Sequence, residues 1–468
     1  MAVGDAARSW FAALSTPVAG GGRLRSFIGR HAVALLVLGF AAVSAIGAVW
    51  IQSAVSEFSG PITPSGHHDF FAFYSAATLI HGGHAPALYD AGTLTALQRQ
   101  LYPHPVGYAG YMPFINPPAA AALLSPLAAM PESTARLVWL LISVALAVAC
   151  AMVLSAGRDI RIRGLAILVV LATFPAYQTF TEGQWSFVLL LGCLGALVAA
   201  RRNQPLLAGI ALSVLWLKPP LLVLVLVWLL LTRHWRVAAA MAGGVVAITV
   251  AALPWTGLES NLNYVRYLGD VVAAHAGGAG AAGQTAWEGA LPNMEGLIGL
   301  AATLFGQQNA LAVDAATALL AAILVGFYAW AMRTHWRDRP MRLGHVLAAV
   351  CLGLLLDPHL YAQDCALVIV LVALVLGRAQ TEPMPRRRGD PGPDSIRAQA
   401  AILLAGAVLL DLSAIDTYWV QGLVFKPLHI FTFVLIAGVV IAAWPRRASA
   451  PAVRHPDLGL RTVIPEPR

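Results

Sequence analysis

Residues 32–52 read AVALLVLGFAAVSAIGAVWIQ, and residues 65–74, which follow shortly after, read SGHHDFFAFY. The first run is long and apolar enough to cross a bilayer once, and its flanks do not show a signal-peptide cleavage pattern. The second run sets one acid, Asp69, between two histidines and four aromatic residues. Aromatic side chains gather where lipid meets headgroups, so Asp69 is predicted at a membrane surface with its carboxylate facing a polar cavity.

The composition extends this prediction to the whole chain. Of 468 residues, 59% are hydrophobic and 11% are charged, and the mean hydropathy is +0.72. A soluble domain of this size does not need so much apolar surface, so we expect an all-α polytopic membrane protein. The net charge of +8 comes from short basic clusters between apolar runs, which is the positive-inside pattern rather than a nucleic-acid-binding face.

The basic clusters divide the chain into about twelve predicted spans. The spans cover residues 32–52, 136–156, 164–181, 185–200, 237–254, 311–332, 343–356, 362–377, 398–413 and 426–444, with two short helices inside 205–232. Both flanks of 205–232 are basic and Lys218-Pro219-Pro220 interrupts it, so we expect a hairpin that returns to its starting side. Both chain ends are then cytoplasmic, at a bacterial inner membrane.

These spans predict one transmembrane domain at 32–444, with cytoplasmic tails at 1–31 and 445–468. Two outer loops are long, at about 57–135 and about 255–310. A short apolar helix near 118–130 in the first loop is expected to be re-entrant or interfacial. The second loop contains a Gly-Ala stretch, 277–283, that can act as a flexible hinge. The four cysteines fall within predicted spans, so we expect neither a disulfide nor a zinc site.

Two interpretations of Asp69 stay open. Asp is a favoured N-cap residue, and Asp69 could cap a helix that starts at Phe70. It could instead be a functional carboxylate, because partial burial makes a carboxylate a better base near neutral pH. For Asp90, which follows a Gly-rich turn, capping of the next helix is the favoured interpretation.

Lys218 is one of two lysines in the chain, and it lies in the middle of an apolar run. An ammonium at that depth costs about 3 kcal/mol unless it is paired or solvated. A lipid-linked phosphate is the favoured partner, and pairing with Asp69, Glu182 or Asp364 is the alternative. The second lysine, Lys426, lies at a span end, where snorkelling accounts for it.

Two polar segments lie between spans on the predicted outer side. Glu182-Gly183-Gln184-Trp185 would form a tight turn, and its Glu and Gln could also hydrogen-bond to sugar hydroxyls. Residues 357–364, DPHLYAQD, are dense in polar groups and suggest the wall of a cavity. Within them, Asp364 could also be a helix cap.

The ordered set of these motifs resembles glycosyltransferase family 87, over roughly residues 30 to 380. The elements that carry the resemblance are Asp69 with its aromatics and the later Tyr89-Asp90, Asn116-Pro117-Pro118 with Pro126, Glu182-Gly183-Gln184, Ala208-Gly209 through Lys218-Pro219, and Pro358 to Asp364. The resemblance implies the GT-C superfold, whose members are integral-membrane transferases that use polyprenyl-phosphate sugars.

The resemblance also implies a reaction, and the polar residues singled out above are the candidate site for it. The reaction is an inverting transfer of mannose, or another hexose or pentose, to an outward-facing glycan or lipid of the cell envelope, with Asp69 as the general base. The donor phosphate would be bound by Lys218, Arg266 and His68. The sugar or acceptor would be bound by Tyr74, Glu182, Gln184, His359, Tyr361 and Asp364. No nucleotide is needed, no cofactor is firmly predicted, and a divalent cation is left open.

Two other classes of function are consistent with the chain. A lipid or sugar transporter or flippase would explain the spans and the buried charge, but it predicts repeated halves and acids near the bilayer midplane. This chain instead places its acids at outer loop ends and shows no strong internal repeat. A non-catalytic partner in polysaccharide assembly is the third hypothesis, and it predicts that Asp69→Asn keeps full function.

Overall fold

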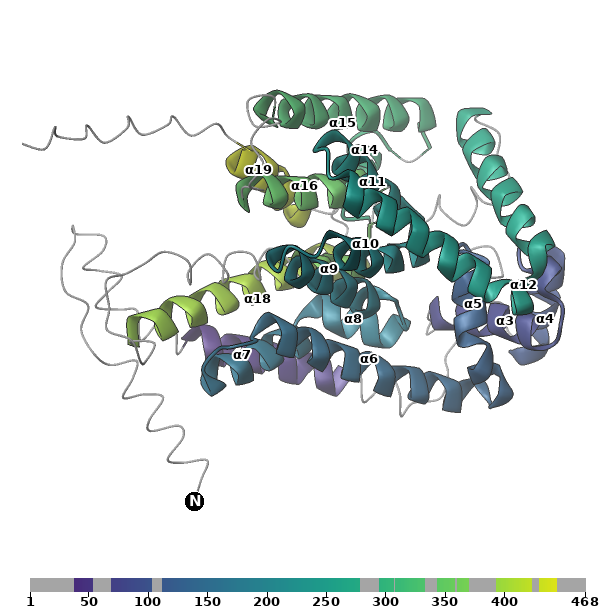
Figure 1. Cartoon of the computed structure of the whole chain (residues 1–468), viewed down its shortest axis with the longest axis horizontal. Helices are drawn as coiled ribbons and strands as arrows, with labels where there is room; N and C mark the ends of the chain where they lie inside the picture. The colour runs from purple at the N-terminus through teal and green to yellow at the C-terminus, as the bar shows by residue number, and fades with distance from the viewer. Residues whose placement is uncertain are drawn as a thin grey trace, which may run out of the picture.

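The computed structural model describes residues 38–53, 69–102, 112–277, 294–306, 308–332, 343–357, 360–369, 393–422 and 429–443. Within these ranges the chain is helical and contains no strand, which confirms an all-α protein. Figure 1 shows many of the longer helices, α6, α7, α15 and α18 among them, running roughly along the long axis of the molecule. His68, His359, Lys426, the stretch 278–283 and both predicted tails lie outside the described residues.

The elements follow one another in chain order after a first helix, Leu38–Ser53. The α-helices are α3 (Asp69–His81), α4 (Ala91–Leu101), α5 (Pro118–Leu124), α6 (Glu132–Leu154), α7 (Ile160–Leu171), α8 (Phe174–Glu182), α9 (Ser186–Arg201), α10 (Pro205–Leu212), α11 (Pro219–Leu231), α12 (Trp235–Gly277), α14 (Leu297–Phe305), α15 (Ala310–Met332), α16 (Leu343–Leu356), α18 (Pro393–Gly422) and α19 (Ile430–Ala443). The 3₁₀ helices are η1 (Ala85–Ala87), η2 (Ser125–Ala129), η3 (Ser213–Leu217) and η5 (Ala362–Val368).

Several of these helices have the properties of membrane spans. Among the described residues, three helices are long and apolar enough to cross a bilayer, namely α6, α15 and the part of α12 from Trp235 to Asp270. The bent pair α7 and α8 passes the same test when it is taken as one span. A membrane protein is therefore supported, while the total of about twelve spans and the orientation stay predictions.

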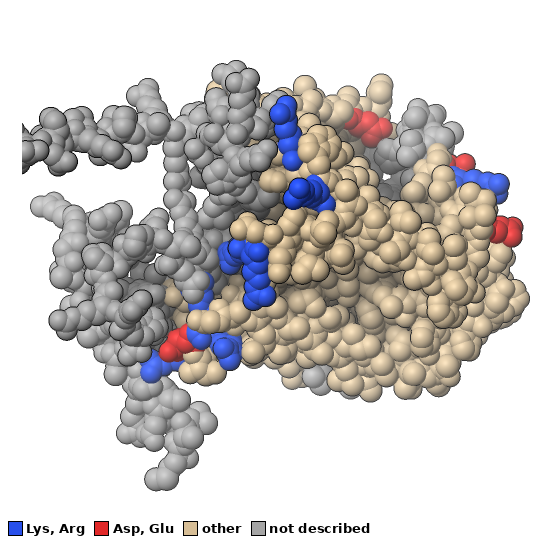
Figure 2. Space-filling view, viewed as in Figure 1, with Lys and Arg blue, Asp and Glu red and all other residues tan. Residues whose placement is uncertain are grey.

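The distribution of charge agrees with the positive-inside pattern. Figure 2 shows that, on the face in view, the described Lys and Arg side chains gather mostly toward one end of the molecule. Basic residues next to short connections, such as Arg161, Arg201 and Arg236, border the ends of α7, α9 and α12. A one-sided set of arginines is what a protein held in one orientation requires.

The span predicted at 164–181 is two helices rather than one. α7 and α8 meet at an angle of 55°. Pro175 lies in the first turn of α8, where its missing N–H is tolerated but a continuous helix from α7 is not. The N–H of Phe174 donates instead to Asp411 Oδ1 of α18 at 2.7 Å. The bend directs the end of α8, with Glu182, toward the first loop.

The segment 205–232 is broken at Lys218, as its prolines predicted. Lys218 lies between η3 and α11. The start of α10, at Pro205 to Leu207, and Arg236 at the start of α12 line one pocket of about 530 Å³. α10 approaches α12 closely because Gly209 has no side chain, and a Cβ there would lie 2.4 Å from the carbonyl oxygen of Val237. The start of the segment therefore lies beside the start of α12, shortly after the segment ends, and the hairpin itself stays a prediction.

The helices of the first loop pack against one another and against α12. The short apolar helix predicted near 118–130 is present as α5 and η2, and α3 packs against both. Asp90 caps α4, since its Oδ1 accepts the Thr93 N–H at 2.7 Å. Hydrogen bonds from the Thr93 side chain and backbone lower the pKa of Asp90 below its ordinary value. The capping interpretation of Asp90 is confirmed.

α8 and α3 meet at Gly183, the residue that ends α8. Gly183 has a φ of +69°, and a Cβ added there would lie 2.6 Å from Phe70 Cβ. Gly157 has a nearly equal φ of +70°, but a Cβ there would meet no atom within 4 Å. The two glycines carry the same backbone constraint and differ in what surrounds them.

We expect Gly183→Ala to destabilise the protein more than Gly157→Ala. Each alanine adds left-handed backbone strain of about 1–2 kcal/mol, and Gly183→Ala must also push α3 away from α8. The measurement is thermal unfolding of both variants in detergent micelles. Equal losses of melting temperature would contradict the close contact between α3 and α8.

Candidate active site

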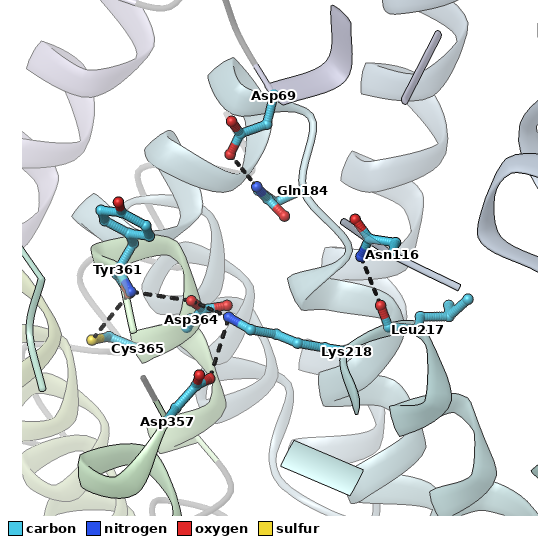
Figure 3. A network of polar contacts seen from close by, with 9 residues as sticks. All are labelled: Asp69, Asn116, Gln184, Leu217, Lys218, Asp357, Tyr361, Asp364 and Cys365. Carbon is cyan, nitrogen blue, oxygen red and sulfur yellow. Dashed lines mark hydrogen bonds and ion pairs between the residues drawn. The ribbon is translucent and has the colours of Figure 1, made fainter. Parts of the chain in front are cut away.

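Asp69, the first residue of α3, is held by the turn that ends α8. Its backbone N–H donates to Glu182 Oε2 at 3.2 Å, across 113 residues of sequence. Its carboxylate accepts a short hydrogen bond from Gln184 Nε2, as Figure 3 shows. Both polar residues of the Glu-Gly-Gln turn therefore contact the same residue of the first loop.

The turn is fixed by a buried aromatic cluster. Trp139 of α6 donates from Nε1 to the carbonyl oxygen of Gly183 at 2.7 Å. The rings of Trp139 and Trp185 meet edge to face at 4.9 Å, and Trp185 lies 5.8 Å from the ring of Phe73 in α3. Such contacts hold side chains in one arrangement, so Gln184 is presented to Asp69 from a rigid support.

Lys218 lies between two carboxylates from the polar segment 357–364. Its Nζ is 3.4 Å from Asp357 Oδ2 and also pairs with Asp364 Oδ2. Asp364 Oδ2 accepts the backbone N–H of Tyr361 at 3.1 Å as well. Both carboxylates are almost fully buried, and the Lys218 side chain is 17% exposed. The pairing with Asp364 that the sequence offered as an alternative is present, and a contact with phosphate stays a prediction.

This ion-pair cluster explains how an ammonium is tolerated at the break of an apolar segment. A buried charge is costly unless it is paired and hydrogen-bonded, and Lys218 has two anionic partners. With all three groups ionised, the cluster carries one net negative charge. Such a cluster can accept hydrogen bonds from hydroxyl groups and donate hydrogen bonds to them, because carboxylate oxygens accept and the ammonium donates.

The Asp69 turn and the ion-pair cluster belong to adjoining elements. η5, which contains Asp364, contacts both α8 and α9, the two helices that the Gln184 turn connects. η3, which leads into Lys218, contacts α9 as well. Figure 3 shows the two polar groups in one region, with Asp69 and Gln184 on one side and Lys218, Asp357 and Asp364 on the other.

Asn116 joins the first loop to the chain next to Lys218. Its Nδ2 donates to the carbonyl oxygen of Leu217 at 2.8 Å. The backbone carbonyl oxygen of Asn116 accepts a hydrogen bond from the Tyr89 hydroxyl at 2.7 Å. Burial raises the pKa of Tyr89 well above its ordinary value, so this hydroxyl keeps its proton and remains a donor. The position of Lys218 is thus linked to that of the first loop.

The other predicted site residues are placed differently. Tyr74 is buried, and its hydroxyl donates to the carbonyl oxygen of Met130 at 2.8 Å. Arg266 is exposed on α12, where its Nη1 donates to Asn263 Oδ1 at 3.1 Å. These contacts do not join either residue to the Asp69 turn or to the ion-pair cluster, and their roles stay predictions.

Two carboxylates of this region were not singled out from the sequence. Asp357 directly follows α16 and supplies half of the anionic charge around Lys218. The sequence included it only as the first residue of the polar segment 357–364 and gave it no role of its own. Glu295 is 2% exposed and precedes α14. Its N–H donates to the Leu360 carbonyl oxygen at 2.8 Å, and its carbonyl oxygen accepts the Thr432 hydroxyl at 2.6 Å. Glu295 thus anchors the second outer loop to the polar segment.

A divalent cation has no ligand set among the described residues, where no group of three or more His, Cys, Asp or Glu side chains is arranged to hold a metal. Asp357 and Asp364 supply two carboxylates, but the group between them is the Lys218 ammonium.

We expect Lys218→Met to lower the stability by about 3–5 kcal/mol, because it leaves two buried carboxylates without their cation. Adding Asp364→Asn removes one of these charges, so the double variant should lose less than the sum of the two single variants. Thermal unfolding in detergent of the unmodified protein, the two single variants and the double variant gives a double-mutant cycle. Strictly additive losses would contradict a direct pairing of Lys218 with Asp364.

Comparison with known proteins places the chain in a family. The model of glycosyltransferase family 87 matches residues 114–358, which include Asn116, Gln184 and Lys218 but begin after Asp69. No curated protein and no solved structure matches the chain. The matched region covers more than half of the 468 residues, and it contains Asn116, Glu182, Gln184, Lys218 and Asp357 of the site described above. The chain therefore belongs to glycosyltransferase family 87.

Proposed function

We propose that this protein is an inverting glycosyltransferase that moves a sugar from a polyprenyl-phosphate donor to an outward-facing glycan or lipid acceptor. Family membership supplies glycosyl transfer. The observation that carries the rest is the fixed carboxylate of Asp69, hydrogen-bonded to Gln184 at the start of α3. A base for an acceptor hydroxyl must be held in place at the point of attack.

Asp69 acts as the general base in this proposal. Its carboxylate takes the proton of the acceptor hydroxyl while the hydroxyl oxygen bonds to the anomeric carbon of the donor. The bond between that carbon and the phosphate oxygen breaks, and polyprenyl phosphate leaves with the electron pair, so the configuration inverts. An ionised carboxylate has about four lone-pair sites, so a hydrogen bond from Gln184 does not prevent it from accepting a proton.

Lys218 is proposed to stabilise the leaving phosphate. An ammonium has three N–H donors, and Asp357 and Asp364 account for two. A fixed positive charge near a leaving group lowers the barrier to its departure, and the Lys218 ammonium is the charge proposed for this role. Arg266 and His68 are proposed as further phosphate contacts.

The sugar and the acceptor are proposed to lie between the two polar groups. Asp364 and Tyr361 at the ion-pair cluster, Glu182 at the α8 turn, and Tyr74 and His359 are the candidate contacts. The donor sugar is mannose or another hexose or pentose, and the site faces outward from a bacterial plasma membrane. A transferase is favoured over a transporter or a non-catalytic assembly partner because the family is one of transferases.

For Gln184 we propose a positioning role rather than the sugar contact that the sequence suggested. Its amide donates to Asp69, and the backbone on its N-terminal side is held by Trp139. The neutral amide of Gln184 thus fixes the position of the Asp69 carboxylate and is not itself a base that could take the acceptor proton.

We expect Asp69→Asn to lower the rate of sugar transfer by a factor of about 10² to 10⁴, the usual contribution of a positioned base. The control is Asp90→Asn in the next helix cap, because Asn caps a helix as well as Asp does and transfer should be unchanged. The assay follows transfer from a panel of short-chain polyprenyl-phosphate hexoses and pentoses by the purified protein. Full activity of Asp69→Asn would refute the assignment.

We expect substitutions of Gln184 to move the acidic limb of the pH–rate profile. Gln184→Glu sets a like charge beside Asp69, which favours the protonated base, so the limb moves to higher pH. Gln184→Leu removes the donor to the ionised carboxylate and shifts the limb in the same direction. A profile unchanged in both variants, with only a higher KM for the acceptor, would show that Gln184 binds substrate instead.

A further inference from the structure

The part of α12 beyond Gly257 distributes its side chains over three faces. One face is apolar and exposed, since Leu258, Leu262, Val265 and Leu268 recur at intervals of three or four residues and are 38–67% exposed. This spacing places all four on one side of a helix. Four large apolar side chains open to solvent on one short helix are unusual unless something apolar covers them.

The second face packs on the protein. Ser260 and Tyr264 are buried on it. The rings of Tyr264 and Tyr267 each lie 5.3 Å from the ring of Tyr89 in the first loop. Asn263 adds a hydrogen bond from Nδ2 to the Pro86 carbonyl oxygen at 3.0 Å. This face fixes the orientation of the helix, so the apolar face cannot turn inward.

The third face carries the charges. Glu259, Arg266 and Asp270 are exposed and fall on the remaining side of the helix, between the apolar and the packed faces. A helix with one face on protein, one apolar and one charged has the pattern of a helix that lies in a membrane surface.

The length of α12 requires a change of direction at the membrane surface. The apolar part, Trp235–Asp270, has 36 residues, which as a straight helix would measure about 54 Å. The hydrocarbon core of a bilayer is about 30 Å thick. The backbone of Gly257 is not helical, with φ of 67° and ψ of 168°, so α12 has a kink there. Up to this kink the helix measures about 33 Å, which suits one crossing. Trp255 marks this end, where aromatic residues gather at the membrane surface.

The direction of α12 beyond Gly257 also agrees with a helix that lies in the membrane surface. In Figure 1 the second part of α12 runs across the direction of α6 and α15, at the end of the molecule where α3 and α4 lie. The exposed apolar side chains before the bend, Val246 at 60% and Val250 at 56%, make the lipid-facing surface continuous up to Trp255.

We propose that the part of α12 from Leu258 to Asp270 lies in the bilayer surface on the side of the first loop, with its leucine and valine face in lipid. The partner is the headgroup and upper acyl region of that leaflet. Arg266, proposed above as a contact for the donor phosphate, then lies at the depth of the lipid headgroups, where the phosphate of a polyprenyl donor also lies. Through Tyr89 and Asn116 the helix is also joined to Leu217, beside Lys218, so the depth of this helix in the membrane sets the position of the first loop.

The test places a nitroxide spin label on each face of the full-length protein in nanodiscs of phosphatidylethanolamine and phosphatidylglycerol. Leu262→Cys and Val265→Cys report the apolar face, and Glu259→Cys and Arg266→Cys are matched controls one to three residues away. Protein without an added cysteine gives the background from the native cysteines, three of which are buried. Collision rates with oxygen, which concentrates in lipid, and with a water-soluble nickel chelate are compared.

The proposal predicts an oxygen-to-nickel collision ratio several-fold higher at residues 262 and 265 than at 259 and 266. Equal ratios dominated by nickel would overturn it by showing that the helix stands in water. Labels at 262 and 265 that neither reagent reaches would also overturn it, by showing that another segment or a second copy covers this face. Either position alone decides the matter if the other variant does not fold. The result does not depend on transferase activity, so it stands or falls separately from the proposed reaction.

Discussion

The hydrogen bonds between Asp69 and the turn at the end of α8 are the contacts on which the rest of the structure depends. They join the first residue of α3 to a turn more than a hundred residues away. The turn can reach Asp69 because α8 bends away from α7 and because Gly183 leaves room for Phe70. Without these features the carboxylate would be set by a mobile helix end, and a proton acceptor needs a fixed position.

The second constraint is the charge of Lys218. The break before Pro219 places an ammonium inside an apolar segment, and two buried carboxylates offset the cost of burying that charge. The same break positions Leu217 for its hydrogen bond to Asn116. One sequence feature, a lysine before two prolines, therefore breaks the apolar segment, pairs with Asp357 and Asp364, and provides the cation of the proposed site.

Local patterns in the sequence predicted those features of the structure that depend on residues close together in the chain. Hydropathy predicted α15 and α16 nearly to the residue, proline chemistry predicted the break at Lys218, and Asp90 was recognised as a cap because its partner is three residues away. These features need no information about distant parts of the chain. Membership of the family was likewise visible in the order of short motifs.

Tertiary contacts were not predictable in this way. The bend before α8 depends on Asp411, which accepts the Phe174 N–H from 237 residues away. The role of Gln184 depends on where α3 begins, and that of Asp357 on the return of the chain to Lys218. The sequence predicted a loop after residue 254, and the continuation of α12 as a helix there was missed. The exposed apolar residues of this part begin only after Gly257, where the helix is interrupted. Each of these depends on a partner that no local window contains.

The most direct test of the central claim is chemical rescue of Asp69→Ala by azide, with a polyprenyl-phosphate sugar as donor. Azide attacks the anomeric carbon without losing a proton, so it does not need a base. The account predicts that this variant fails to glycosylate its hydroxyl acceptor but forms a glycosyl azide of inverted configuration. A variant that binds donor yet forms no azide product, or that still transfers to the hydroxyl acceptor at the normal rate, would contradict Asp69 as the base.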